Sequence, residues 1–320
     1  MSSALYTRIR DHEATTALTA ADVRKRVLDA ATRIATDPAF AHTRDLVVVQ
    51  QGEEVVAHRF GGGSVDEPAD TYSVTKSVVS TLAGIALDRG EFGSLDDELS
   101  SYLGDAPDGL TLRHLLTMTV GAETEGPWEI DEVMARPSGW VDWILAAPRR
   151  HEPGLEFAYD NGAAHVLGAA LAAATGAPLS AFAHEWLFAP LGISEYEWPR
   201  DPDGRDYGFG HLRLRPRELA TIGLLYLGGG EYRGRRVVSQ DYVDGATRQQ
   251  SEGGPPEGAA YGFFWWVAGE PFPHFFAGGY AGQSVTVIPQ LELVAVTTGD
   301  EARLRRGWRN ARHAILDALT

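Results

Sequence analysis

The spacing of hydrophobic and polar positions changes along the chain, and it predicts a helix followed by a hairpin near the start. Thr19 and Asp22 form a capping pair, and the apolar positions after them recur at helical spacing. Two apolar segments, Asp45–Gln50 and Glu54–Phe60, then flank the turn residues Gln51-Gly52-Glu53. This arrangement predicts two antiparallel strands joined by a tight turn.

The middle of the chain, from about residue 71 to residue 191, has mostly helical patterns. The segment Val74–Leu87 is apolar on nearly every face, which predicts a helix buried in the core. The alanine-rich segment Gly162–Ala174 predicts a second helix, which a Thr-Gly pair ends. Residues 216–227 predict a third, with proline in its first turn and glycines beyond its end.

Strand patterns return in the last part of the chain. The aromatic segment Tyr261–Val267 predicts one strand, and Gln283–Ile288 and Leu291–Thr297 predict two more. The amphipathic pattern from Arg303 to Leu319 predicts a closing helix.

Strands at both ends and helices between them predict an α+β fold. We expect one antiparallel sheet built from N- and C-terminal strands and flanked by helices, with an inserted, mostly helical lobe. The expected sheet lobe combines residues 1–70 and 200–320, and the expected helical lobe covers residues 71–199. The active site is expected between the two lobes.

Composition and charge narrow the classes of function. Of the 320 residues, 44% are hydrophobic and 22% are charged, as in ordinary globular proteins. Lys+Arg 28 against Asp+Glu 44 gives a formal net charge of -16, which disfavours nucleic acids and anionic membranes as partners. The chain has no cysteine, which excludes disulfides, thiolate nucleophiles and cysteine-based zinc or iron–sulfur sites.

The sequence also bears on location. Residues 1–20 contain no apolar core of signal-peptide length, and no apolar run approaches the length of a membrane span. We therefore expect a cytoplasmic protein. The sequence leaves the oligomeric state open.

Ser73 and Lys76 open the predicted apolar helix, three residues apart and therefore on one helical face. A buried lysine is unfavourable as a cation unless it is paired or loses its proton. A neutral lysine amine there can accept the proton of the Ser73 hydroxyl, and the helix N-terminus favours the resulting oxyanion. The alternative interpretation is that Ser73 only caps the helix and Lys76 lies on the surface.

Tyr159 and Asn161 lie just before the alanine-rich helix. Residues two apart in an extended segment point the same way, so both side chains can enter one pocket. A phenol beside a lysine ammonium loses its proton more easily and can move protons between serine and leaving group. The Asn161 amide can orient the lysine and the substrate carbonyl. The alternative is a turn that caps the helix.

The segment Ala277-Gly278-Gly279-Tyr280 leads into the predicted strand Gln283–Ile288. Glycines at a strand edge let a ligand approach the backbone closely. A backbone N–H here, together with that of Ser73, can form an oxyanion hole, typically worth about 3 kcal/mol per donor. The alternative is a glycine-rich hairpin turn.

The three motifs, in this order and at these separations, resemble the serine β-lactamase and penicillin-binding-protein-like family. The similarity is greatest to its class C-like branch, which includes esterases, D,D-peptidases, transacylases and 6-aminohexanoate-dimer hydrolases. It covers about residues 40–300 and includes further stretches: Leu115–Thr119, Leu187–Ile193, Pro216–Ala220 and Gly262–Trp266.

This resemblance assigns a role to each motif. It implies that Ser73 is the nucleophile, Lys76 its activating base and Tyr159 the general acid/base. It also implies a supporting role for Asn161 and an oxyanion hole made by the backbone N–H groups of Ser73 and Tyr280. No metal or organic cofactor is implied, and the expected partner is a small-molecule acyl substrate.

The third motif departs from the pattern of family members that bind β-lactams, which usually carry Lys-Thr-Gly or His-Thr-Gly. Ala277-Gly278-Gly279 lacks the cation and the hydroxyl that would hold a substrate carboxylate. Together with the lack of a signal peptide, this favours a small ester or amide over a β-lactam. We expect a serine hydrolase. An acyltransferase with the same acyl-enzyme and a non-catalytic binding relative are the alternatives.

Competing catalytic motifs are missing from the sequence. Neither G-x-S-x-G nor H-E-x-x-H occurs, and the ten histidines show no ligand spacing. His165 is predicted to pack in the core, and His211 to lie in a surface loop. Five tryptophans can either wall an acyl site or pack in the core: Trp128, Trp140, Trp143, Trp265 and Trp266.

Overall fold

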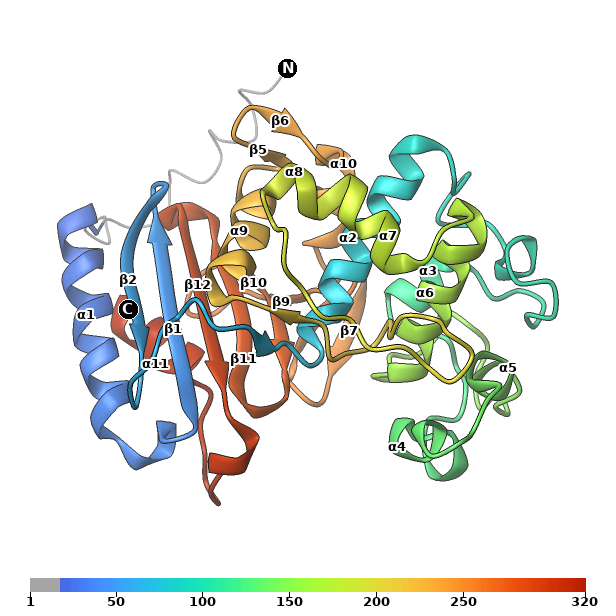
Figure 1. The fold of residues 1–320 in the computed structure, drawn as a ribbon, viewed down its shortest axis with the longest axis horizontal. Coiled ribbons are helices and arrows are strands. Elements are labelled where there is room, and N and C mark those ends of the chain that lie inside the picture. Colours follow the sequence, from blue (N-terminus) through green and yellow to red (C-terminus); the bar gives the residue numbers. More distant parts are fainter. Residues whose placement is uncertain (1–17) are drawn as a thin grey trace.

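The computed structural model describes residues 18–320, and its central feature is an eight-stranded sheet (Figure 1). The strand order is β2-β1-β12-β11-β10-β9-β8-β7, and every neighbouring pair is antiparallel. The strands are β1 (Thr43–Gln50), β2 (Glu53–Arg59), β7 (Ser251–Gly254), β8 (Ala259–Tyr261), β9 (Trp266–Ala268), β10 (His274–Gly279), β11 (Gln283–Ile288) and β12 (Leu293–Gly299).

The two ends of the described chain meet in this sheet. The β1–β2 hairpin lies at one edge, and β1 also pairs with β12, with Val47 opposite Val296. A strand that pairs on both sides and is covered on both faces needs apolar residues throughout, which explains the run Leu-Val-Val-Val in β1. The predicted α+β fold, with one antiparallel sheet built from both ends of the chain, is confirmed.

Helices cover both faces of the sheet (Figure 1). Helices α1 (Ala20–Thr36) and α11 (Ala311–Leu319) pack together on one face, and α9 (Pro216–Leu227) packs against β1, β11 and β12 on the other. Side chains alternate along β1 accordingly. Leu46 and Val48 join the core under α1 and α11, whereas Val47 and Val49 join the larger core on the opposite face.

Helix α2 (Val74–Arg89) connects the sheet to the helical region. Every residue from Val74 to Ala86 is buried, as the uniformly apolar pattern predicted. Helix α2 packs against β10 and β11 and also against α6 (Asn161–Thr175). The remaining helices are α3 (Leu112–Leu116), α4 (Ile130–Met134), α5 (Trp140–Leu145), α7 (Leu179–Ala183), α8 (Ala189–Leu191) and α10 (Gln240–Ala246).

Three sequence expectations about the C-terminal elements were wrong in detail. Tyr261–Val267 is not one strand, because the chain reverses at Gly262–Trp265 between β8 and β9. Strand β12 begins at Leu293, after a short 3-10 turn over Pro289–Leu291. The closing helix begins at Ala311, where Asn310 caps it, and not at Arg303.

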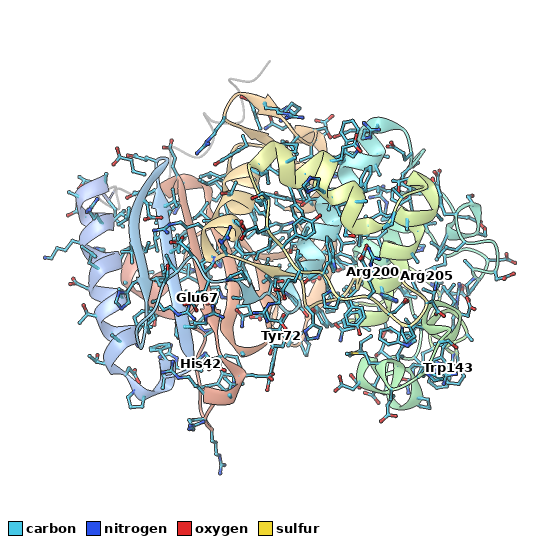
Figure 2. The ribbon with its side chains drawn as sticks, viewed as in Figure 1. His42, Glu67, Tyr72, Trp143, Arg200 and Arg205 are labelled. Atoms are coloured by element: carbon cyan, nitrogen blue, oxygen red, sulfur yellow. The ribbon has the colours of Figure 1, made fainter. Side chains whose placement is uncertain are left out.

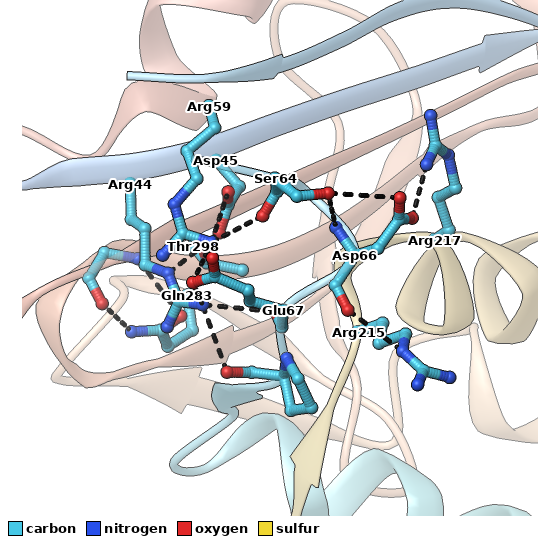
Figure 3. Close-up of polar contacts among 12 residues, drawn as sticks. Arg44, Asp45, Arg59, Ser64, Asp66, Glu67, Arg215, Arg217, Gln283 and Thr298 are labelled. Atoms are coloured by element: carbon cyan, nitrogen blue, oxygen red, sulfur yellow. Dashed lines mark hydrogen bonds and ion pairs between the residues drawn. The ribbon is translucent and has the colours of Figure 1, made fainter. Parts of the chain in front are cut away.

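A network of ion pairs around a buried carboxylate connects the sheet edge to the loop that leads into α2 (Figure 3). The Asp45 carboxylate on β1 is fully buried; it accepts a hydrogen bond of 2.6 Å from Thr298 Oγ1 on β12 and lies 3.2 Å from Arg44 Nε. Arg59 bridges Asp45 to Glu67 at 3.7 Å and 2.9 Å. Burial raises the pKa of Asp45, and the Thr298 hydroxyl and both arginines oppose that rise.

Two short pairs of strands complete the structure. Strand β3 (Ala69–Asp70) follows the network directly and pairs with β4 (Arg213–Leu214), whereas β5 (Glu231–Tyr232) pairs with β6 (Arg235–Arg236). The β3–β4 pair lies between the sheet and the helical region, next to the start of α2. Figure 2 shows Tyr72, two residues beyond β3, at this junction.

Some expectations concern features that the described residues do not test. The lobe boundaries, 1–70 with 200–320 and 71–199, stay a prediction. Residues 1–17, which form most of the segment without a signal-peptide pattern, lie outside the described residues. Within residues 18–320 no single helix is long and apolar enough to cross a membrane; Asn161–Thr175 and Leu179–Leu191 reach that length and apolarity only as a pair bent by 74°.

Candidate active site

Ser73 is the N-cap residue of α2, and its side chain makes no capping hydrogen bond. Its hydroxyl instead accepts a hydrogen bond of 2.9 Å from Lys76 Nζ, one turn along the helix. Lys76 is 1% exposed and ranks among the largest fully buried side chains. The alternative of a capping serine with a surface lysine is therefore wrong.

Burial determines the protonation of Lys76. Desolvation lowers the pKa of its amine to about 7, and the nearby Asp160 carboxylate only partly opposes that shift. Asp160 is itself 8% exposed, and burial raises its pKa, so it is a weakened counter-charge. At neutral pH a large fraction of the lysine is the free amine, which is the form that can accept a proton.

Three oxygen atoms surround the Lys76 amine. Besides Ser73 Oγ, they are Asn161 Oδ1 at 2.8 Å and the Phe209 carbonyl at 2.6 Å. An amide or carbonyl oxygen can only accept, so these two oxygens take the two N–H bonds of a neutral amine. The remaining lone pair is then directed at the Ser73 hydroxyl. The Phe209 carbonyl was not predicted, because a backbone carbonyl leaves no mark in the sequence.

Tyr159 and Asn161 come from the start of α6. Asp160 caps that helix by accepting a hydrogen bond from the Ala163 N–H at 3.0 Å, which leaves Tyr159 extended and Asn161 at the first helical position. The Tyr159 ring lies 5.0 Å from Lys76 Nζ and stacks on Trp266 with centroids 5.8 Å apart. The structure thus brings together the four side chains that the first two motifs predicted.

The pKa of the Tyr159 phenol is raised, whereas a lysine ammonium beside it was expected to lower it. Burial raises the pKa of Tyr159, and a hydrogen bond with Ser73 offsets only part of that rise. The phenol therefore keeps its proton at neutral pH, whereas Lys76 can lose its own. Environments that push the pKa values of two groups apart favour distinct acid and base roles.

The glycine-rich motif forms the end of β10 and approaches the nucleophile from the sheet side. A Cβ atom on Gly279 would lie 2.7 Å from the Thr71 carbonyl and 3.2 Å from Ser73 N, so this close approach requires glycine. Tyr280 begins a 3-10 turn, where a backbone N–H has no partner within the turn. Among residues 18–320, the Ser73 N–H also donates no hydrogen bond.

Gly278 faces a carboxylate. A Cβ atom there would lie 2.9 Å from Glu257 Oε1. Glu257 pairs with the buried Arg312 on α11 at 2.9 Å, and the Arg312 guanidinium lies 3.5 Å from the Phe276 ring centroid. An acidic side chain therefore lies beside the third motif, where β-lactam-binding relatives carry a cation.

Two pockets meet at Ser73 and Asn161. The first, which we call the Tyr159 pocket, has a volume of about 600 Å³ and is also lined by Tyr159, Glu257, Trp266 and Trp308. The second, which we call the His211 pocket, has a volume of about 510 Å³ and is also lined by Tyr72, Asp131, Met134 and His211. Tyr280 lies on the wall of both.

The expectations for histidines and tryptophans had mixed outcomes. His165 is 1% exposed, as predicted. His211 lies in an irregular, partly exposed segment, as predicted, but its ring also lines a pocket at Ser73. Trp140 and Trp265 pack in the core, and of the five tryptophans considered only Trp266 lines the Tyr159 pocket. Trp308 lines it too and was not predicted, because the sequence placed it within the expected closing helix, which begins only at Ala311.

Comparisons with known proteins identify the family to which the chain belongs. The family described as "Beta-lactamase" matches residues 37–319. The chain is 26% identical over 280 residues to 6-aminohexanoate-dimer hydrolase from Paenarthrobacter ureafaciens, with 79% of this chain and 71% of that protein covered. It is 30% identical over 179 residues to D-alanyl-D-alanine-carboxypeptidase/endopeptidase AmpH from Escherichia coli (strain K12), covering 49% of this chain and 46% of that protein.

A solved structure shares the fold. That of EstCE1, described as a hydrolase with promiscuous acyltransferase activity, aligns with a TM-score of 0.73 at 19% identity over 93% of this chain and 98% of that one. The family match extends over most of the chain, from before the first strand of the sheet into its last helix. The chain belongs to the β-lactamase family.

Proposed function

We propose that this protein is a serine hydrolase that cleaves a small ester or amide through an acyl-enzyme on Ser73. The observation that carries the proposal is the buried Lys76 amine, held by two acceptor oxygens and 2.9 Å from Ser73 Oγ. The membership in a family that includes hydrolases of amide bonds supports it.

Acylation would begin at the Ser73 hydroxyl. Its proton passes to the Lys76 lone pair as Oγ bonds to the substrate carbonyl carbon. The developing oxyanion is held by the backbone N–H groups of Ser73 and Tyr280, at the N-terminus of α2. Because neither donor is used within the described chain in a competing way, both are available to a ligand.

Departure of the leaving group needs a proton, and Tyr159 is the proposed donor. Its phenol is protonated at neutral pH, since burial raises its pKa. When the bond from carbonyl carbon to leaving group breaks, the phenol gives its proton to the leaving atom. The Lys76 ammonium then restores the phenol, which leaves an ester on Ser73 and both groups in their starting state.

The surroundings of the third motif argue against β-lactams as substrates. Ala277 and Gly278 provide no cation or hydroxyl, and the Glu257 carboxylate lies beside Gly278. A substrate carboxylate at this place would meet a like charge, although Arg312 neutralises part of it. The aromatic walls of Trp266, Tyr280 and Trp308 suit an apolar group, although Arg309 and His313 line the same pocket.

An acyltransferase with the same acyl-enzyme is the second candidate. The two pockets of similar volume that meet at Ser73 favour it, since one could hold the acyl donor and the other an acceptor alcohol or amine. Hydrolysis and transfer share the first half-reaction and differ only in the second nucleophile. A product analysis with and without added alcohols separates the two.

A fluorophosphonate probe tests the nucleophile. We expect the wild-type protein to be labelled on Ser73 and Ser73→Ala to lose the label. Ser64→Ala, in an exposed loop, is the matched control and keeps it. Intact mass after incubation with short esters, amides and acyl thioesters then identifies the acyl group. A wild-type protein without label or adduct would favour the remaining alternative, a non-catalytic binding relative.

The cytoplasmic location expected from the sequence is part of the same proposal. An acyl donor from metabolism, and not from the cell wall, would fit that location. Fractionation of cells that produce the full chain, with detection by a C-terminal tag, tests it directly.

A further inference from the structure

His211 and Asp70 form a pair at the second pocket of Ser73. His211 Nδ1 and Asp70 Oδ2 lie 2.8 Å apart, and the two side chains are 33% and 27% exposed. His211 follows Phe209 by two residues, so the segment that supplies the carbonyl for Lys76 also carries this ring. Asp70 ends β3, two residues before Tyr72 and three before Ser73. Both partners therefore come from segments that bound the site.

The backbone at this place is strained. His211 has φ 67° and Tyr72 has φ 44°, in the left-handed region that favours glycine. The two rings contact each other with centroids 5.3 Å apart. Non-glycine residues persist in this conformation when surrounding contacts hold them, and such positions cluster at functional sites. A glycine would relieve the strain at position 211 but would remove the ring from the pocket.

The pair fixes which nitrogen of the ring is free. Since Asp70 can only accept when ionised, the proton lies on Nδ1, and Nε2 carries the lone pair. Among the residues that the structure describes, Nε2 makes no hydrogen bond, and the ring lines the pocket that Ser73 also lines. A histidine with a carboxylate on one nitrogen and an open pocket at the other has the arrangement of a general base.

We propose that His211, oriented by Asp70, accepts the proton of the water that hydrolyses the acyl-enzyme. This inference rests on the proposed function, because it requires an acyl group on Ser73. The water would occupy the His211 pocket, which the leaving group does not need. The leaving group takes its proton from Tyr159, which lines the other pocket and not this one.

Deacylation by this route conserves every atom and proton. The water oxygen bonds to the acyl carbonyl carbon, and one water proton passes to His211 Nε2. The resulting tetrahedral intermediate collapses and breaks the bond between the carbonyl carbon and Ser73 Oγ. The imidazolium returns its proton to Oγ, so the products are a free acid and the starting enzyme. Neither a cofactor nor a redox partner enters.

The charges around the ring are compatible with this role. The Asp70 hydrogen bond raises the pKa of His211, burial and Lys76 oppose the rise, and Glu301 adds to it. The Asp70 carboxylate therefore stabilises the imidazolium that forms when the ring accepts a proton. The titratable groups that face the ring or line its pocket are Asp70, Tyr72, Lys76, Asp131 and Glu301.

The test separates acylation from deacylation. Stopped-flow release of p-nitrophenol from p-nitrophenyl acetate gives the burst and steady-state rates, and intact mass follows the acetyl adduct. In His211→Gly we expect the deacylation rate to fall by about 10²-fold while the burst rate changes little, so the adduct accumulates. Added imidazole should restore turnover, which a structural role would not permit.

A second His211 variant and a control variant separate a role as a base from a structural role. His211→Asn tolerates the left-handed backbone and can keep the Asp70 hydrogen bond, but it is no base, and it should accumulate the adduct as well. His151→Asn removes another histidine paired with a carboxylate, Glu156 at 3.3 Å, that lines neither pocket, and it should behave as wild type.

The outcomes distinguish the two proposals. A wild-type protein that forms no acetyl adduct contradicts the proposed function. Adduct formation with unchanged deacylation in both His211 variants contradicts the role of His211 alone. An equal loss of burst and steady-state rates, without imidazole rescue, also overturns it, because His211 would then only position Ser73.

Discussion

Two histidine–aspartate pairs within residues 18–320 lie in very different surroundings. His165 Nε2 and Asp201 Oδ2 lie 3.1 Å apart with both side chains fully buried. The His165 ring contacts Trp140 and Phe209 with centroids 5.7 Å away in each case. The pair of His211 and Asp70 has a shorter separation but lies open to a pocket at Ser73.

The difference lies in the second ring nitrogen. His165 Nδ1 accepts a hydrogen bond of 3.4 Å from the Gly208 N–H, so both nitrogens of that ring are used within the protein. His211 Nε2 makes no hydrogen bond within residues 18–320. The same two residue types therefore contact Gly208 in one case and face a pocket at Ser73 in the other. A histidine–aspartate pair indicates chemistry only when one nitrogen remains available.

The largest expected effect tests the Lys76 amine, which donates to the Phe209 carbonyl in the segment that carries His211. In Lys76→Met the side-chain length is kept and the amine is lost, so acylation should fall by about 10³-fold or more. The burst rate with p-nitrophenyl acetate measures it. A burst near the wild-type rate would show that the lysine is not the base.

The next largest expected effect is a difference in the free energy of unfolding between variants of the two pairs. His165→Leu leaves Asp201 buried without its partner, and the free energy of unfolding should fall by about 3 kcal/mol. His211→Gly loses one half-exposed hydrogen bond but relieves a strained φ, so its stability should stay within about 1 kcal/mol of wild type. Urea unfolding of both variants measures the contrast. Equal losses would remove the distinction drawn between the pairs.

A Tyr159 variant tests the difference between the two pockets that meet at Ser73. In Tyr159→Phe the stacking on Trp266 remains, but the proton for the leaving group is lost, and the acylation rate should fall by about 10²-fold. The effect should be largest for amides and alkyl esters, which need a protonated leaving atom. A p-nitrophenyl ester, with a good leaving group, serves as the internal control.

The smallest expected effect is the dependence of the acylation rate and of the free energy of unfolding on pH. Because burial lowers the pKa of Lys76 to about 7, the acylation rate should fall tenfold per pH unit well below that value and level off above it. The unfolded chain binds this proton up to its ordinary pKa of 10.5, so the free energy of unfolding should rise with pH between the two values. Lys76→Met should lack this rise, and a wild-type protein that lacks it too would contradict the lowered pKa.

The sequence was informative wherever the signal was local. The uniform apolarity of Val74–Leu87 predicted a buried helix, and the spacing of Ser73 and Lys76 placed them on one face of it. The hairpin before that helix followed in the same way from two apolar segments and the turn residues between them. Short-range geometry fixes these relations once the secondary structure forms.

Sequence patterns did not predict features that depend on contacts between residues far apart in the chain. The aromatic run Tyr261–Val267 looked like one strand, but Phe264 adopts φ 56° and Trp265 turns into the core, so the chain reverses within it. His211 was expected in a surface loop because nothing near it in the sequence shows that Asp70, 141 residues away, holds its ring at a pocket.

The sequence by itself determined which groups are available: a hydroxyl and an amine one turn apart, a phenol and an amide two residues apart, and glycines that admit close backbone approach. Only the tertiary structure decided their states. Packing from β10, α6 and the 208–211 segment removes water from Lys76 and Tyr159, which moves the pKa of the amine down and that of the phenol up. Desolvation depends on every neighbour in space, and the order of residues along a chain does not record those neighbours.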